Sequence, residues 1–375
     1  MAGLTTGGGD RFPHRMTDLQ ISERRMRSSG LAGVPFADPV EVVRRHGAMQ
    51  AQEYGLAKWA IGQRADGLVD EDLDRALSAG TIARTHVLRP TWHFVAREDL
   101  RWLLALTGPR VQRHNEPRCR ELGLDHRTLS RSQSLIASAL EGGNRLTRNE
   151  IADVLDGARI DRSGQRLPYI LMHCELEAVV CSGGFSGRQH TYALVDERVP
   201  NDGRFDRDDA LGELARRYLA GHGPATVRDL RWWSSLTVAD IREALGMLGS
   251  EAASEEWGGI TFWSLAASHE DPLEEGSVQL LHAFDELIVG YTHSRYFGDP
   301  RGESARAAWR DGTFPRGIIL QGGRIAGHWR RTLEKDSVTI EALLYERMEA
   351  RALRAAADAL GRFVGRRSNV ETSLL

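Results

Sequence analysis

The sequence predicts an α+β protein of three tandem winged helix-turn-helix units, followed by a small β-barrel with a terminal helix. Two observations lead to this prediction. A capped short helix, a second helix and a two-stranded hairpin recur about every 70 residues. Beyond residue 270, short apolar or alternating segments between glycines replace this pattern and indicate a sheet.

The chain length agrees with several domains. Its 375 residues exceed one ordinary core, since a domain takes about 100 to 150 residues. We assign residues 1–25 to a flexible tail, 26–110, 111–203 and 204–270 to the three units, and 271–375 to the barrel and helix.

The first unit opens at Asp38 and Pro39. Aspartate can cap the free amides of a helix, and proline fits the first helical position. A second helix is expected over residues 71–78, and two strands over 81–88 and 91–95 that meet at Arg89 and Pro90.

The second unit begins with a capping box, because the side chains of Thr147 and Glu150 can satisfy each other's backbone amides. A helix is then expected over residues 167–181. Residues 185–194 form a hairpin with a polar, basic tip that contains Arg188, as expected of a wing.

The third unit covers residues 226–263, with two helices capped by Thr226 with Asp229 and by Thr237 with Asp240, before the segment 257–263. The charged segment 204–209 before it is the best linker candidate. The C-terminal strands are expected over residues 278–281, 287–291, 317–320, 324–329 and 338–343, and the last helix over 346–364.

Charge and cysteine content limit the possible functions. The net charge is −3 and Lys58 and Lys335 are the only lysines, so arginine carries nearly all positive charge. Arginine suits phosphate and guanine edges, although a GC-rich genome would also explain its abundance. Three cysteines provide neither a disulfide framework nor a zinc pattern, and the segment 173–175 has the H-x-E of zinc deaminases without their P-C-x-x-C. We therefore expect no metal and no cofactor.

The chain has no apolar run of the roughly 20 residues that a membrane helix needs. Its first fifteen residues lack the apolar core of a signal peptide. We expect a cytoplasmic protein that does not contact membranes.

Two glutamines, Gln50 and Gln52, lie in the predicted turn between helices. In an extended or turning segment, residues i and i+2 share a side, so both carboxamides can act together if the helix ends before them. The alternative is that they are ordinary surface glutamines.

Five segments together resemble the AlkZ-like winged-helix DNA glycosylases, in order along residues 16–375. They are Met49-Gln-Ala-Gln-Glu53, His86-Val-Leu-Arg-Pro-Thr-Trp-His-Phe-Val95, the segment 223–237 with Trp232 and Trp233, Phe284-Asp-Glu-Leu-Ile-Val-Gly-Tyr291, and Gly323-Arg-Ile-Ala-Gly-His-Trp-Arg330. The resemblance implies three winged-helix units and a barrel around a DNA channel. It also implies that Gln50 and Gln52 are the catalytic pair.

This resemblance implies a DNA-repair enzyme that hydrolyses the N-glycosidic bond of N7-alkylated purines, including bulky or crosslinked ones, and protects producers of alkylating antibiotics. Such a purine carries its own positive charge, so the enzyme needs to position water and stabilise the sugar rather than protonate the base. Glu53 is the alternative base. With two lysines available, a monofunctional enzyme is favoured over one that forms a Schiff base.

Double-stranded DNA is the expected partner, bound by a monomer, with His93, Arg89 and Arg188 as phosphate contacts. Each of these can instead be a structural or ordinary surface residue. The alternative functions are a non-catalytic winged-helix transcriptional regulator, which would dimerise on paired sites, and a scaffold that binds proteins.

Overall fold

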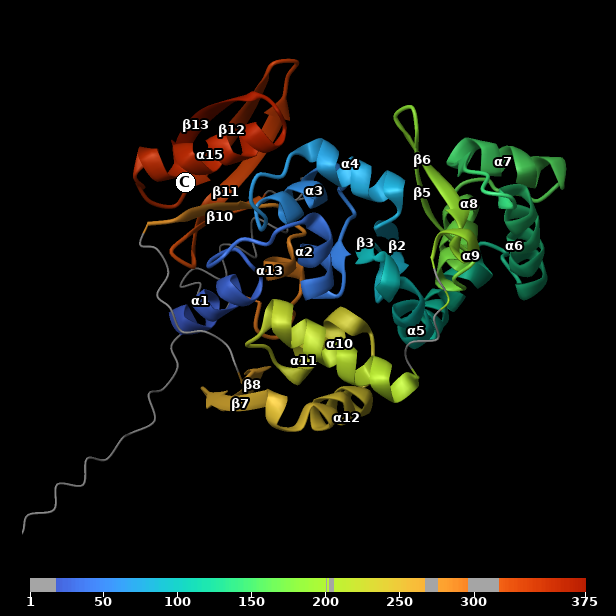
Figure 1. Ribbon diagram of the computed structural model, residues 1–375, viewed down its shortest axis with the longest axis horizontal. Coiled ribbons are helices and arrows are strands. Elements are labelled where there is room, and N and C mark those ends of the chain that lie inside the picture. The colour runs from blue at the N-terminus through green and yellow to red at the C-terminus, as the bar shows by residue number, and fades with distance from the viewer. Residues whose placement is uncertain (1–17, 200, 202–205, 267–275, 296–316) are drawn as a thin grey trace, which may run out of the picture.

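The computed structural model describes residues 18–199, 201, 206–266, 276–295 and 317–375 (Figure 1). Helices and strands alternate along this part of the chain, as predicted for an α+β protein. One arrangement occurs three times: a helix, a short strand, two helices and a hairpin whose second strand pairs with that short strand.

The first unit has its three strands in the order β1-β3-β2. Asp38 caps its first helix, accepting hydrogen bonds from the amides of Val40 and Glu41, as predicted. The elements are α2 (Pro39–His46), β1 (Met49–Gln50), α3 (Tyr54–Gly62), α4 (Asp70–Ala79), β2 (Ile82–Val87) and β3 (Arg89–Ala96).

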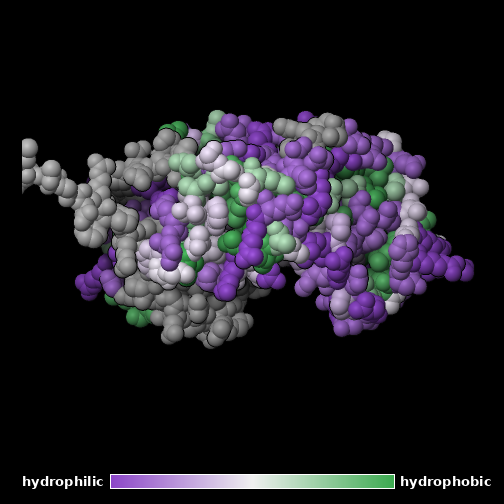
Figure 2. Space-filling model, turned by 90° about the horizontal axis from the view of Figure 1, so that it is seen from below, coloured by the Kyte–Doolittle hydropathy of each residue, from purple (hydrophilic) through white to green (hydrophobic). Residues whose placement is uncertain are grey.

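The second unit repeats this topology with the strand order β4-β6-β5. The helix α5 (Leu100–Glu121) connects the two units and crosses the expected boundary at residue 110. The elements are α6 (His126–Leu140), β4 (Leu146–Thr147), α7 (Arg148–Gly157), α8 (Arg166–Leu176), β5 (Val180–Ser186), β6 (Gln189–Leu194) and the short α9 (Val195–Arg198). In Figure 2 the molecule narrows beside a lobe at the right, and its surface is mostly hydrophilic.

In the third unit a single bridge between Ala225 and Trp263 replaces the short first strand. The predicted capping boxes of Thr226 with Asp229 and of Thr237 with Asp240 are both formed. The elements are α10 (Arg207–His222), α11 (Val227–Ser234), α12 (Val238–Leu248), β7 (Ala252–Trp257) and β8 (Ile260–Leu265).

The C-terminal region is a five-stranded sheet in the order β13-β12-β11-β10-β9. Among the described residues its edge strands β9 and β13 do not pair with each other, so the predicted barrel is not closed. The elements are β9 (Val278–Leu281), α13 (Glu286–Val289), β10 (Gly317–Gln321), β11 (Arg324–Leu333), β12 (Ser337–Leu344), α15 (Ala350–Phe363) and β13 (Arg367–Leu374).

Four local predictions differ from the structure. Residues 18–25, assigned to the tail, belong to the helix α1 (Asp18–Ser28). The linker candidate 204–209 lies partly outside the described residues, and Asp206 caps α10. The helix expected to reach Cys181 ends at Leu176, so Cys181 lies in β5. The strand expected over 287–291 is instead the short helix α13, because Asp285 caps it.

The buried apolar residues form several separate clusters. The largest cluster joins α5 and the third unit, a second joins the first unit to the C-terminal sheet, and a third fills the second unit. Within the described part of the chain, no helix combines the length and hydropathy needed to cross a membrane.

Candidate active site

A cavity of about 890 Å³ lies where the first unit, α5, α11 and the segment around α13 meet. The described residues that line it include four arginines and a histidine but no acidic residue. The basic residues are Arg89, Arg110, Arg231, Arg295 and His114. Such an excess of positive charge attracts phosphate groups.

Backbone carbonyls hold two of these arginines in place. Arg110 Nε donates to the carbonyl of Ser235 at 2.6 Å, and Arg89 Nη1 donates to that of Val289 at 3.0 Å. The guanidinium of Arg89 lies 5.7 Å from the ring centroid of Trp232, whose exposed fraction is 46%. The cavity therefore combines fixed cations with an accessible aromatic surface.

Gln50 lines this cavity from the last position of β1. Its exposed fraction is 7%, and its side-chain Oε1 is buried without a hydrogen-bond partner among the described atoms. Its backbone N–H donates to Glu286 Oε1 at 2.6 Å. The residue opposite it in β3 is His93. Gln50 is thus fixed through its backbone, and its carboxamide oxygen remains unpaired.

Gln52 lies two residues further, in the turn before α3. The N–H of Ala51 donates to the carbonyl of Trp92 at 2.6 Å, which extends the β1–β3 ladder by one residue. The strand β1 itself ends at Gln50, and Gln52 lies in a bend beyond it. Its Oε1 accepts a long hydrogen bond of 3.4 Å from the N–H of Trp92. Gln52 is exposed and does not line the cavity itself.

His93 is fully buried. Its Nδ1 donates to the carbonyl of Thr91 at 2.8 Å, and its Nε2 has no partner among the described atoms. Burial, together with the charge of Arg89, lowers the pKa of His93 to about 3, so the ring is neutral. The predicted contact between His93 and a DNA phosphate is not supported, because no atom of the ring reaches the surface.

Arg89 does line the cavity, and its Nε and Nη2 lack partners among the described atoms. Burial lowers the pKa of this guanidinium. Arg188, in contrast, is exposed at the turn between β5 and β6 and is not among the cavity residues. The structure therefore separates two residues that were predicted to act alike.

Glu286 is the residue that the sequence analysis missed. Its Oε2 accepts hydrogen bonds of 3.0 Å from both His222 Nε2 and Trp233 Nε1, while its Oε1 holds the N–H of Gln50. Burial alone would raise the pKa of Glu286, but His222 and Arg89 hold it below its ordinary value. An acidic pair inside the apolar run 284–291 was the available signal, since a buried carboxylate requires partners.

The alternative base, Glu53, precedes α3 and does not line the cavity. It is half-buried, and burial raises its pKa while Arg331 of β11 lowers it. Cys174 and Cys181 are free, buried thiols on different elements, and the described residues contain no group of three potential metal ligands.

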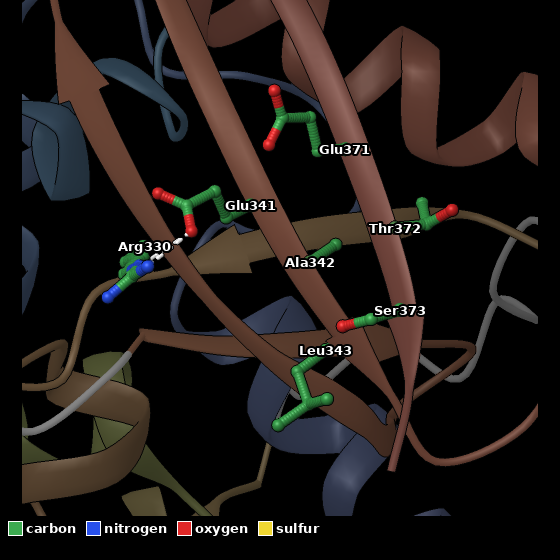
Figure 3. Close-up of a pocket in the computed structure, with 7 residues that line it drawn as sticks. All are labelled: Arg330, Glu341, Ala342, Leu343, Glu371, Thr372 and Ser373. Atoms are coloured by element: carbon green, nitrogen blue, oxygen red, sulfur yellow. Dashed lines mark hydrogen bonds and ion pairs between the residues drawn. The ribbon is translucent and has the colours of Figure 1, made fainter.

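A second cavity, of about 490 Å³, lies on the C-terminal sheet (Figure 3). Its charged groups are largely paired, since Arg330 Nη2 and Nε both donate to Glu341 Oε2. The lining residues are Arg330, Glu341, Ala342, Leu343, Glu371, Thr372 and Ser373. None of the predicted site residues lies there.

Repeated helix–strand units beside an arginine-lined cavity are typical of a protein that binds a phosphate-bearing ligand. A sequence model of the family described as DNA glycosylase AlkZ-like matches residues 43–363. The chain belongs to this family and is a DNA-repair glycosylase, which confirms the resemblance and the predicted enzyme class. A regulator or a scaffold is correspondingly disfavoured.

The solved structure of Streptomyces sahachiroi DNA glycosylase AlkZ is similar to this chain. The TM-score is 0.79 at 21% sequence identity, over 96% of this chain and 100% of that one. No curated protein sequence matches. The likeness supports a common fold.

Proposed function

We propose that this DNA glycosylase hydrolyses the N-glycosidic bond of N7-alkylated purines in duplex DNA, at the cavity that contains Gln50. One observation carries the proposal: a buried carboxamide oxygen without a partner lies in an arginine-lined cavity. An unpaired buried acceptor is costly to retain, so such a group indicates a ligand or a bound water.

The uncharged carboxamide of Gln50 favours a leaving group that departs without being protonated. A carboxamide orients water through hydrogen bonds but does not act as a general base near neutral pH. An N7-alkylated purine already carries positive charge and departs without protonation. We assign the main water-positioning role to Gln50 and a supporting role to Gln52, which lies two residues further and accepts from the N–H of Trp92.

We further propose that the three repeated units are winged-helix modules of a monomeric enzyme that binds duplex DNA without a metal. Arg89 would contact the lesion-bearing strand, and Arg188 would contact a phosphate from the tip of the second wing. An open cavity of about 890 Å³ has room for bulky or crosslinked adducts, which fits protection against alkylating antibiotics.

A monofunctional mechanism is supported by the position of Lys58. This side chain is buried, and its Nζ lies 2.6 Å from Asp70 Oδ2 and 2.9 Å from Asp74 Oδ1. An amine engaged by two carboxylates is not free to attack a sugar carbon, so it is unsuited to forming a Schiff base. Water is the proposed nucleophile.

The test is base release from a duplex with a single N7-methylguanine, followed as abasic sites under single-turnover conditions. The wild type should release the base, Gln50→Ala should lose nearly all activity, and Gln52→Ala should lose part of it. Gln165→Ala, at an exposed glutamine outside the cavity, is the matched control and should keep the wild-type rate. Equal rates for wild type and Gln50→Ala would refute the proposal.

A further inference from the structure

One face of the first sheet carries an unusual set of unpaired polar atoms. Gln50 of β1, His93 of β3 and Thr85 of β2 are paired across the strands, so their side chains lie in one row on the same face. Each contributes a buried atom without a partner among the described residues: Gln50 Oε1, His93 Nε2 and Thr85 Oγ1.

Further unpaired atoms lie along β3, toward the cavity. Next to His93 along β3, the register with β2 shifts between Trp92 and Arg89, so Arg89 and Thr91 border an irregular stretch of the strand. Arg89 Nε and Nη2 and Thr91 Oγ1 are also buried without partners among the described atoms, and both residues line the cavity. His93 does not line the cavity itself, but Gln50, its partner across the ladder, and Thr91, which accepts from its Nδ1, both do.

The tautomer of His93 is determined by its contact. A carbonyl oxygen can only accept, so Nδ1 carries the proton that is donated to Thr91. Nε2 consequently presents a lone pair. The charged or titratable groups that act on the ring are Arg89, Glu286 and His86, with Arg89 opposing its protonation and Glu286 favouring it.

These atoms complement one water molecule. Gln50 Oε1 and His93 Nε2 can accept its two hydrogens, and Arg89 can donate to one lone pair, which leaves the second lone pair free. Buried waters typically make about three hydrogen bonds to groups that would otherwise be unsatisfied.

We propose that His93 is a further catalytic residue, the base that takes the proton from the water held by Gln50. This inference rests on the proposed function. The water oxygen forms a bond to C1′ as the C1′–N9 bond breaks, and that bond's electron pair neutralises the departing cationic purine. The proton from the water passes to His93 Nε2 and then to solvent.

The low pKa of His93, about 3, is compatible with this step. A water attached to an oxocarbenium-like carbon is strongly acidic, so a weak base suffices to remove its proton. Because the ring is neutral throughout the working range, the chemical rate should be independent of pH between about 6 and 8.

The test uses His93→Asn, since the Asn side-chain N–H can replace Nδ1 as donor to Thr91 but offers no atom at Nε2. His46→Asn is the matched control. His46 is equally buried, its Nδ1 lies 2.9 Å from the carbonyl of Val42, and its Nε2 also lacks a partner among the described atoms, but it lies in α2 and is not paired with Gln50. Both variants should lose similar stability.

We expect His93→Asn to lower the single-turnover rate of base release on the order of 10²-fold without changing duplex affinity, and His46→Asn to keep the rate. Added imidazole should partly restore His93→Gly and leave Gln50→Ala unchanged. A full rate in His93→Asn, or absence of imidazole rescue in a folded His93→Gly, overturns the inference. An active Gln50→Ala would instead refute the proposed function itself.

Discussion

The first and second units share one topology but differ where the first short strand ends. In the second unit Thr147 ends β4 and caps α7 at once, in a capping box with Glu150. In the first unit β1 ends at Gln50, and three residues separate it from α3. The last of them, Glu53, is the N-cap residue, but its side chain makes no capping hydrogen bond. At this position the second unit satisfies its polar groups locally, whereas the first leaves the carboxamide oxygen of Gln50 without a partner among the described atoms, beside a cavity.

The third unit follows the second in this respect, because Thr226 directly follows the bridging residue Ala225 and caps α11. Two of the three repeats thus use this position for helix stability. The departure in the first unit removes a cap, which is worth about 1 kcal/mol, and places Gln50 in the site instead. A functional site is expected where one repeat lacks a stabilising contact that the other repeats form.

The largest predicted effect is a loss of stability of the first unit at acidic pH. Three fully buried histidines with an unpaired Nε2, His46, His93 and His282, lie in the first unit or beside it, and burial lowers their pKa values to about 3, 3 and 4. The unfolded chain binds these protons below about pH 6.5 and the folded chain does not, so stability is lost as pH falls from about 6.5 to 4.

Each of these histidines contributes up to about 1.4 kcal/mol per pH unit in that window. Urea unfolding at pH 7 and 5 measures the sum, and hydrogen exchange should show β3 losing protection before β5. Equal unfolding midpoints at the two pH values would contradict the buried neutral rings, and a comparison of pH 7 with pH 8 serves as control.

The next prediction concerns the rate of base release after residues are exchanged between the first and second units. Gln50→Thr places in the first unit the residue that the second uses, and we expect base release to fall on the order of 10²-fold, as when one preorganised polar group is removed from a site. The fold should persist. Thr147→Gln, the reciprocal change, should leave the rate of base release unchanged. A Gln50→Thr enzyme of normal rate would show that the two positions are equivalent.

Glu286 provides a smaller test, because it fixes the backbone of Gln50 without lining the cavity. In Glu286→Gln one carboxylate oxygen becomes an amide donor that faces Gln50 or Trp233, both of which also donate. We expect about a tenfold slower chemical step at unchanged duplex affinity, since a misplaced group costs rate rather than binding.

Asp285→Asn is the matched control for Glu286→Gln. Asp285 forms a fully buried pair with Arg64, with atoms 2.7 Å apart, so this variant should lose more stability. Its effect on rate at a temperature where it is folded should be smaller. The reverse ranking of the two rates would remove the positioning role from Glu286.

The local parts of this structure could be predicted from the sequence. The caps at Asp38, Thr147, Thr226 and Thr237 were predicted correctly because each depends on residues three apart or fewer. The final strand β13 was missed, since it is polar and pairs in parallel with β12 across the helix α15.

In the candidate site, too, contacts between residues far apart in the chain could not be predicted from the sequence. The glutamine pair was found through resemblance, but the role of Glu286 depends on Gln50, His222 and Trp233, which lie 236, 64 and 53 residues away in the chain. The pairing of Gln50 with His93 likewise depends on a strand of two residues, too short to show periodicity. Both the role of Glu286 and the neighbour of Gln50 therefore depend on contacts between segments that are distant in the sequence.

The smallest predicted effect is a loss of stability in the second unit. The hydroxyl of Thr147 caps α7, because it accepts from the amide of Glu150 and donates to the carboxylate of that residue. Thr147→Ala removes this cap. We expect a loss of about 1 kcal/mol in the free energy of unfolding and no change in base release. Thr147→Ser, which keeps the hydroxyl, should recover most of that stability. A loss of activity in a stable Thr147→Ala protein would mean that the second unit also contributes to chemistry at this position, and the contrast between the two units would then be one of degree.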